Sequence, residues 1–206
     1  SAGSQTASST QPATPTAQEP AQPTPAEALN ALAEALQQRE RDRRDIHDAI
    51  QLAIAACMTQ RGFKYAPIPY PGTLGENPGE NGLTQDEHDK WTTALIGEPI
   101  PPDAAVESDP SILIAKGPDS TFYMRRDACT TRGRTAIYGD YVKWRTTELT
   151  IDHLENQAIE QAADDKQRQT QTEAQIAAEN AAVINQYARL QDSAIAKAHA
   201  LLAKPH

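Results

Sequence analysis

The chain of 206 residues lacks a membrane-spanning segment, because its longest apolar stretches are only a few residues. It also lacks a Walker loop, a Gly-x-Gly-x-x-Gly turn, an HExxH helix and a nucleophile elbow. Its histidines are scattered and its two cysteines form no Cys-x-x-Cys pair, so we predict no metal site and no cofactor. These absences favour a non-enzymatic protein. An enzyme would need a cleft in which two ionisable groups converge.

The sequence also lacks a basic patch. The formal net charge is −9, and the one Arg-rich run, residues 39–45, is interleaved with acids that suit ion pairs along a solvated helix face. We therefore expect no nucleic-acid partner. An acidic surface favours the approach of cationic partners, including cationic peptides.

The first 25 residues contain no Val, Ile, Leu, Met or aromatic residue and only one charge, Glu19. Such a segment cannot bury enough apolar surface to offset the entropy lost on ordering, so residues 1–24 are predicted to be a disordered tether. Residues 25–206 are predicted to form a single helical domain. A bacterial lipoprotein shows a tether of this composition after its lipidated cysteine, which is not in this sequence. An ordinary domain boundary in a cytosolic protein is the alternative.

A capping box at Thr24–Glu27 and a glycine stop predict a first helix over residues 25–62. Residues 37–45 carry no apolar side chain, so we expect the first half of this helix to fray and the second half to pack. The packed half carries its apolar residues at helical spacing: Ile46, Ile50, Ile54, Cys57 and Met58.

Short elements are predicted over the middle of the chain. A second capping box, at Thr84, begins a helix over 84–96, with Trp91, Leu95 and Ile96 on one face. The Pro- and Gly-rich stretch at 65–83 is predicted to be a solvated loop rather than a calcium site. Residues 111–124 are typical of a small β-hairpin, and a helix over 127–138, capped by Asp127, should end at Gly139.

Residues 140–204 contain neither Gly nor Pro and are rich in Ala, Gln, Glu and Lys, which predicts helix. Two apolar stripes are separated by the polar stretch 163–175, and a capping box occurs at Thr170–Glu173. We therefore predict two antiparallel helices over about 140–167 and 171–203, with one continuous helix as the alternative. The fold class is mainly α.

The two cysteines, Cys57 and Cys129, are predicted to form a disulfide. Each lies on an apolar helical face and is followed by a Gly stop with an aromatic residue nearby, so each marks a place where helices can cross closely. Two free thiols are the alternative. Two cysteines in an exported chain normally form a disulfide. In the loop-entropy model, a bridge between residues as far apart in the sequence as Cys57 and Cys129 stabilises the folded state by about 4 kcal/mol.

The element Cys-Met-x-x-x-Gly-Phe-x-Tyr at residues 57–65 resembles a group of small secreted lipoproteins of actinomycetes. So does the later element Cys129…Ala136-x-Tyr138-Gly139, which Trp144 follows. The resemblance covers about residues 50–145. It implies a Ser/Thr/Pro-rich tether, a helical domain and two cysteines, held at the outer face of the cytoplasmic membrane by an N-terminal lipid anchor that is absent from this chain. Some lipoproteins of similar plan protect a lantibiotic producer from its own peptide.

The functional prediction is a non-enzymatic lipoprotein that binds an amphipathic ligand, a cationic lantibiotic being the concrete expectation. Aromatic side chains with polar tips suit a half-wet groove, although ordinary core packing is the other interpretation of them. The predicted ligand-binding residues are Phe63, Tyr65, Tyr70, Trp91, Tyr123, Tyr138, Tyr141 and Trp144. The alternative function is a structural or partner-binding envelope lipoprotein that uses its C-terminal helices, because residues 176–202 have coiled-coil-like spacing.

Overall fold

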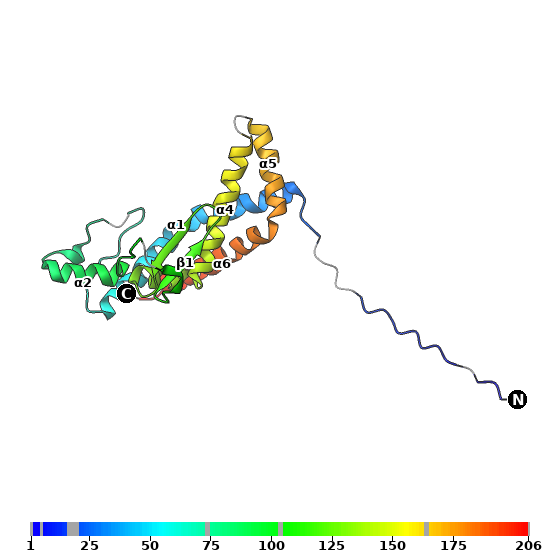
Figure 1. Cartoon of the computed structure of the whole chain (residues 1–206), viewed down its shortest axis with the longest axis horizontal. Coiled ribbons are helices and arrows are strands. Elements are labelled where there is room, and N and C mark those ends of the chain that lie inside the picture. The colour runs from blue at the N-terminus through cyan, green and yellow to red at the C-terminus, as the bar shows by residue number, and fades with distance from the viewer. Residues whose placement is uncertain are drawn as a thin grey trace.

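The computed structural model describes residues 2–4, 6–15, 21–72, 75–102, 105–162 and 165–205. Within these ranges the chain forms six α-helices, two short 3-10 turns and one two-stranded sheet, which confirms the mainly α fold (Figure 1). The described residues before Pro25 form neither helix nor strand, and positions 1, 5 and 16–20 of the predicted tether lie outside the described residues. No helix in the described part is long and apolar enough to cross a membrane.

Helix α1 (Pro25–Gln60) is the element against which four other helices pack: α2 (Gln85–Ile96), α3 (Cys129–Tyr138), α5 (Lys166–Glu179) and α6 (Ala181–Leu202). Its N-terminus has the predicted capping box, because Thr24 Oγ1 accepts from the Glu27 N–H and Glu27 Oε1 accepts from the Thr24 N–H. Its C-terminus is followed by Gly62 at φ 84°, a conformation that glycine adopts without strain. Both ends of α1 therefore follow from local sequence signals.

The first half of α1 is packed, so the expectation that it frays is wrong. Residues 37–45 are polar, but several of them pair with side chains of other helices at the surface. Gln38 donates to Asp192 over 2.6 Å, and His199 lies 2.9 Å from Asp45. Arg39 contacts Asp152 and the hydroxyl of Tyr187. The first half of α1 shares one buried apolar cluster with the C-terminal helices. Its members are Ala28, Leu32, Ala35, Ile151, Leu154, Ala158, Ile176, Ala177, Ile184 and Tyr187.

The C-terminal region forms three helices, which corrects the prediction of two helices or one. Helix α4 (Tyr141–Ala162) and helix α5 (Lys166–Glu179) stand side by side, and helix α6 (Ala181–Leu202) returns along α1 (Figure 1). Asp165 caps α5, whereas Thr170 lies inside it and donates to the Lys166 carbonyl. The second break occurs at Asn180, whose side chain donates to the Ile176 carbonyl over 2.8 Å and competes with the helical hydrogen bonds.

The predicted disulfide between Cys57 and Cys129 is present, with a Cα–Cα distance of 5.5 Å. It joins α1 to helix α3 (Cys129–Tyr138). The two helices approach closely at Gly133, where an added Cβ would lie 2.5 Å from Ile54 Cγ1. Asp127 does not cap α3, because its carboxylate accepts from Arg132 instead, and α3 begins only at Cys129.

Helix α2 (Gln85–Ile96) begins at the predicted Thr84 capping box and packs on the disulfide end of α1 and α3. A 3-10 turn (Pro78–Glu80) precedes it, and another (Val106–Ser108) precedes the sheet. The predicted hairpin is confirmed as antiparallel strands β1 (Ile112–Lys116) and β2 (Thr121–Arg125), with Ile114 opposite Tyr123. Strand β1 packs against α4. Thr73 and Leu74 of the 65–83 loop lie outside the described residues.

Candidate functional site

The eight aromatic residues predicted to bind a ligand do not converge on one site. Tyr65 and Trp91 stack in the core with ring centroids 6.2 Å apart. The indole N–H of Trp91 donates to the Lys64 carbonyl, and the Tyr65 hydroxyl donates to Gln51. Because their polar atoms and most of their surface are already used, these two rings hold the fold together.

A second group, Tyr138, Tyr141 and Trp144, forms a stack where α3 meets α4. The Tyr138 and Trp144 centroids are 3.7 Å apart, and Arg134 lies over the Tyr141 ring. Tyr138 and Trp144 line a cavity of about 220 Å³ between α1, α4 and α6. The indole N–H of Trp144 has no hydrogen-bond partner among the described residues.

Two ionisable groups beside this cavity are perturbed by burial. Burial raises the pKa of the Tyr138 phenol, and the nearby Glu148 carboxylate raises it further. Burial also raises the pKa of Glu148, although the adjacent Arg145 guanidinium opposes that shift. The cavity is smaller than the range of about 300–1,000 Å³ typical of drug-sized ligand sites, so it is too small for a peptide.

Phe63 and Tyr70 lie in two further places. Phe63 packs against the buried cluster around Trp91 and is partly exposed. Tyr70 makes an edge contact with the His47 ring and lies 5.6 Å from the Arg44 guanidinium carbon. Both therefore help to attach the 61–72 segment to the helices.

Tyr123 is the one predicted residue with a largely exposed side chain, at 48%. It lines a groove of about 710 Å³ between α2 and β2, which we call the α2–β2 groove. Ile96, Ile100 and Met124 supply its other large apolar side chains. Ile96 is 51% exposed, so the prediction that it shares the buried face of Trp91 and Leu95 is wrong. Successive residues on a helix are about 100° apart, and this separation turns Ile96 away from the core.

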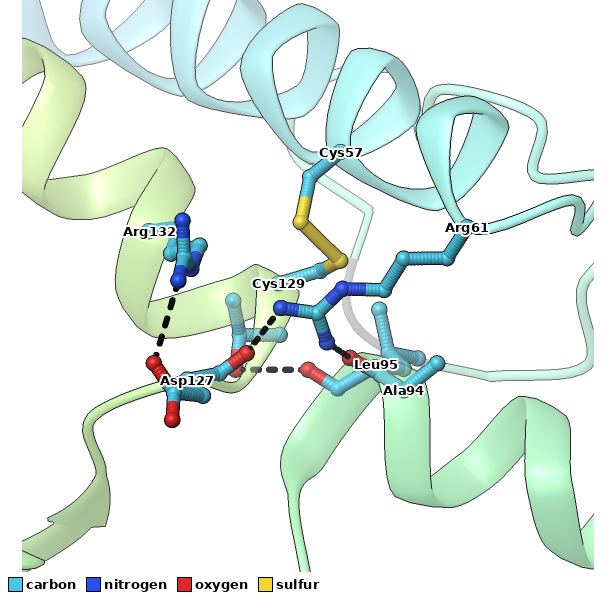
Figure 2. The surroundings of a disulfide bond; sticks show 8 residues. Cys57, Arg61, Ala94, Leu95, Asp127, Cys129 and Arg132 are labelled. Atoms are coloured by element: carbon cyan, nitrogen blue, oxygen red, sulfur yellow. Dashed lines mark hydrogen bonds and ion pairs between the residues drawn. A yellow bond between two sulfur atoms is a disulfide. The ribbon is translucent and has the colours of Figure 1, made fainter. Parts of the chain in front are cut away.

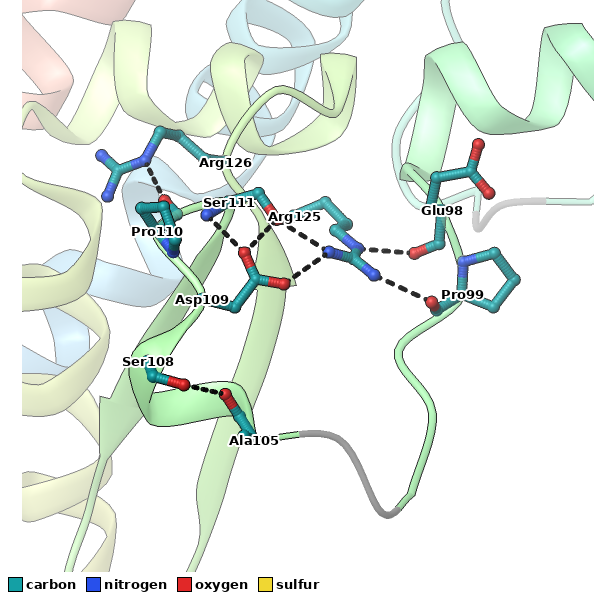
Figure 3. A network of polar contacts seen from close by, with 9 residues as sticks. All are labelled: Glu98, Pro99, Ala105, Ser108, Asp109, Pro110, Ser111, Arg125 and Arg126. Carbon is teal, nitrogen blue, oxygen red and sulfur yellow. Dashed lines mark hydrogen bonds and ion pairs between the residues drawn. The ribbon is translucent and has the colours of Figure 1, made fainter.

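Arg125 joins the two sides of the groove, because it reaches from β2 to the segment after α2 (Figure 3). Its guanidinium donates to the carbonyls of Glu98 and Pro99, over 2.8 and 2.9 Å, and to the Ser111 hydroxyl over 2.9 Å. Asp109 lies 3.6 Å from the same group. The cation of Arg125 is therefore satisfied within the protein, and its hydrogen bonds tie the 98–99 backbone to β2.

A second arginine, Arg61, also holds the C-terminal end of α2, on the side of the disulfide (Figure 2). Arg61 donates to the Ala94 carbonyl over 3.1 Å and to the Asp127 carbonyl. The Thr130 hydroxyl donates to the Leu95 carbonyl over 3.0 Å. These bonds satisfy carbonyls at the C-terminal end of α2, which would otherwise lack helical partners.

A cavity of about 520 Å³ lies beside the groove and shares Asp89, Gly97, Glu98 and Arg125 with it. Asp89 and Glu98 are exposed, and Figure 3 shows the Glu98 side chain pointing away from Arg125. The groove thus combines exposed apolar side chains with two carboxylates at its rim. This composition suits an amphipathic ligand that carries positive charge.

Sequence reasoning found one residue of this groove, Tyr123, and missed the rest. The missed residues lie on one face of α2, on the irregular segment after it and on β2. The α2 residues recur at helical spacing, but all except Ile96 are polar, so they form no apolar stripe that would mark the site. One local signal was available: the adjacent prolines Pro101 and Pro102 indicate an extended stretch after α2. Among the described residues, no three Asp, Glu, His or Cys side chains are placed to hold a metal ion.

Comparison with known proteins finds no family model, no curated protein and no solved structure that matches this chain.

Proposed function

We propose that the protein is a non-enzymatic, extracytoplasmic lipoprotein that binds a cationic amphipathic peptide in the α2–β2 groove. The concrete ligand is a lantibiotic, whose capture would protect the cell that makes it. The observation that carries the proposal is the exposure of Ile96 and Tyr123 across a groove bordered by Asp89 and Glu98. Exposed apolar patches rimmed by polar groups mark interaction sites.

Charge supports a cationic ligand over a neutral one. The whole chain carries −9, and the cationic side chain that spans the groove, Arg125, is already paired with Asp109. Long-range attraction would therefore raise the rate at which a cationic peptide arrives, and the rim carboxylates would orient it.

The disulfide supports an extracytoplasmic location. Disulfides persist in oxidising compartments and are rare in the cytosol. The resemblance of the two cysteine elements to secreted lipoproteins supports the same location and an N-terminal lipid anchor. Exposure of the protein to added protease on intact producer cells, together with its recovery in the membrane fraction, would test both.

The alternative, partner binding through the C-terminal helices, has less support. The apolar stripe that resembled a coiled-coil seam packs within the molecule, where Ile184, Tyr187, Ala194 and Ala198 are buried. Helix α6 contacts α1 along its length, so this stripe is not available to a second chain.

Titration with a cationic lantibiotic tests the proposal, with amide shifts and calorimetry as the two readouts. Tyr123→Ser or Ile96→Ser should weaken binding about tenfold, because each removes one large apolar contact. Glu98→Gln should weaken binding mainly at low salt. The matched control is Ile159→Ser, since Ile159 is 52% exposed on α4, away from the groove. The absence of shifts at groove residues near millimolar peptide would overturn the proposal.

A further inference from the structure

The two-stranded sheet has an edge that no described residue pairs. In an antiparallel ladder, hydrogen-bonded pairs alternate with non-bonded pairs. The backbone N–H of Arg126 donates to Ser111, and the N–H of Gly117 donates to Ser120, so these two pairs are of the bonded kind. Combined with the register, this alternation places Phe122 and Met124 in bonded pairs and Thr121 and Tyr123 in non-bonded pairs.

The backbone groups of Thr121 and Tyr123 therefore point away from β1. Within the described ranges, neither residue makes a backbone hydrogen bond on that side. Arg125, the next residue of the same set, uses its carbonyl to accept from the Ala128 N–H over 3.3 Å. The open part of the edge is thus the Thr121–Tyr123 half of β2.

The Tyr123 end of this open edge lies in the α2–β2 groove. Tyr123, Met124 and Arg125 line one side of the groove, and Ile96, Pro99 and Ile100 line the other. Figure 3 shows Arg125 reaching from β2 to Glu98 and Pro99. Gly97 packs against the same side chain, because an added Cβ would lie 2.4 Å from Arg125 Cβ, so the segment after α2 contacts β2 at Arg125, beyond the open part of the edge.

The edge also lacks the features by which proteins usually protect an exposed strand. Residues 121–124 contain no proline and no charged side chain, and Thr121, Phe122 and Tyr123 are all exposed. Exposed edges are normally blunted by charge, proline or a covering element, because they template the pairing of another chain. Domains that bind extended peptides by strand addition use such an edge.

We propose, resting on the peptide-binding function above, that the bound peptide adds to the Thr121–Tyr123 edge of β2 as a third strand. Its backbone would exchange hydrogen bonds with Thr121 and Tyr123. Successive side chains of a strand point to opposite faces, so alternate apolar residues of the peptide would lie on the Tyr123 face of the sheet. Basic residues beside them would reach Asp89 or Glu98.

The peptide is favoured over a second copy of the chain as the occupant of this edge. Each copy carries a net charge of −9, so two copies would repel each other, whereas a cationic peptide would be attracted. Sedimentation of the unliganded protein tests this directly. A dimer that Tyr123→Pro disrupts would overturn the assignment of the edge to a peptide.

Two variants at one position separate the backbone contribution from that of the side chain. Tyr123→Ala removes the ring and keeps the N–H, while Tyr123→Pro removes both. Proline is tolerated on an edge strand where the N–H faces solvent, so the β1–β2 ladder should persist in both variants. The proline variant should bind the lantibiotic about tenfold more weakly than the alanine variant, because it lacks one hydrogen-bond donor. Equal affinity of the two variants would overturn strand addition.

Hydrogen exchange in the otherwise unmodified protein gives a test that does not depend on the variants folding. Saturation with the lantibiotic should slow exchange of the Tyr123 amide about tenfold or more, while Phe122 and Met124, already bonded to β1, change little. If the peptide binds at the groove but the Tyr123 and Thr121 amides exchange as before, strand addition is wrong and the proposed function stands. If no peptide binds near millimolar concentration, both are wrong.

Discussion

Two buried amide side chains, Gln51 and Asn77, organise the loop that the sequence describes only as rich in Pro and Gly. Gln51 Oε1 accepts from the Tyr65 hydroxyl and from the Ile68 N–H, at 2.8 and 3.0 Å. Asn77 exchanges two hydrogen bonds with the backbone of Ala66. A buried backbone group without a partner is costly, so these amides stabilise a segment that has few apolar contacts of its own.

At the residue scale, Glu148 gives a pH-dependent prediction. Burial raises its pKa in the folded state, although the Arg145 guanidinium opposes the shift. A carboxyl with a raised folded-state pKa stabilises the fold below its unfolded pKa of about 4.3, and that contribution is lost as the pH rises through the folded value. Glu148→Gln should therefore increase stability at pH 7 relative to the unmodified protein, and the difference should shrink toward pH 4.

Urea unfolding at a series of pH values measures this effect, with Glu160→Gln, exposed on the same helix, as the control. The opposite result would be a Glu148→Gln variant that is less stable than the unmodified protein at pH 7, with a smaller deficit at pH 4. That result would mean that the ion pair with Arg145 stabilises the fold by more than burial of the carboxylate costs.

At the scale of the elements, α1 depends on both its cap and its contacts. The capping box at Thr24 is intact, and Ala28 and Leu32 in the next turns are buried. Because the first turns are docked, loss of the cap cannot be absorbed by fraying. Polar residues 37–45 stay helical since their partners lie on α4 and α6, at Asp152, Tyr187 and Asp192.

Thr24→Ala should consequently lower the free energy of unfolding by about 1 kcal/mol. Thr170→Ala is the matched control, because Thr170 was predicted to cap a helix but lies exposed inside α5, where alanine is the better helix former. Chemical denaturation of both variants provides the comparison. Equal stability of Thr24→Ala and the unmodified protein would show that the start of α1 frays after all.

At the scale of the whole molecule, two ends of α1 are stabilised by different means. One end packs with α4, α5 and α6 through the large buried cluster around Leu32 and Tyr187. The other end packs with α2 and α3 through a smaller cluster that contains Cys129. The disulfide belongs to the second cluster, where the connecting segments are long and irregular.

Reduction of the disulfide should lower the free energy of unfolding by about 4 kcal/mol, through the entropy returned to the unfolded chain. Residues 65–125 should lose their exchange protection first, while the cluster of α1, α4, α5 and α6 keeps its own. The Cys57→Ser, Cys129→Ser double variant controls for effects of the reductant. Uniform loss of protection along the chain would contradict the expectation that the two ends of α1 lose protection separately.

The helical fold, most helix ends and the disulfide could be predicted from the sequence, because the signals are local or unambiguous. A capping box, a glycine stop and a helical stripe act within a few residues, and two cysteines allow one intramolecular pairing. The break at Asn180 was not predictable in this way, because asparagine is also tolerated within helices and only the packing of α5 and α6 on α1 selects the bend.

The candidate site was decided by the tertiary structure. Ile96, Ile100 and Tyr123 belong to three separate segments, and Arg125 ties the segment after α2 to β2 so that the three line one groove. Which aromatic rings are buried and which are exposed depends on neighbours far away in the sequence, as for Trp91 with Lys64 and for Tyr65 with Gln51. The sequence alone determined most of the helix ends, the hairpin and the link between Cys57 and Cys129, since these depend on short-range hydrogen bonding and on composition. The groove and the open edge of β2 arise only when those elements pack together.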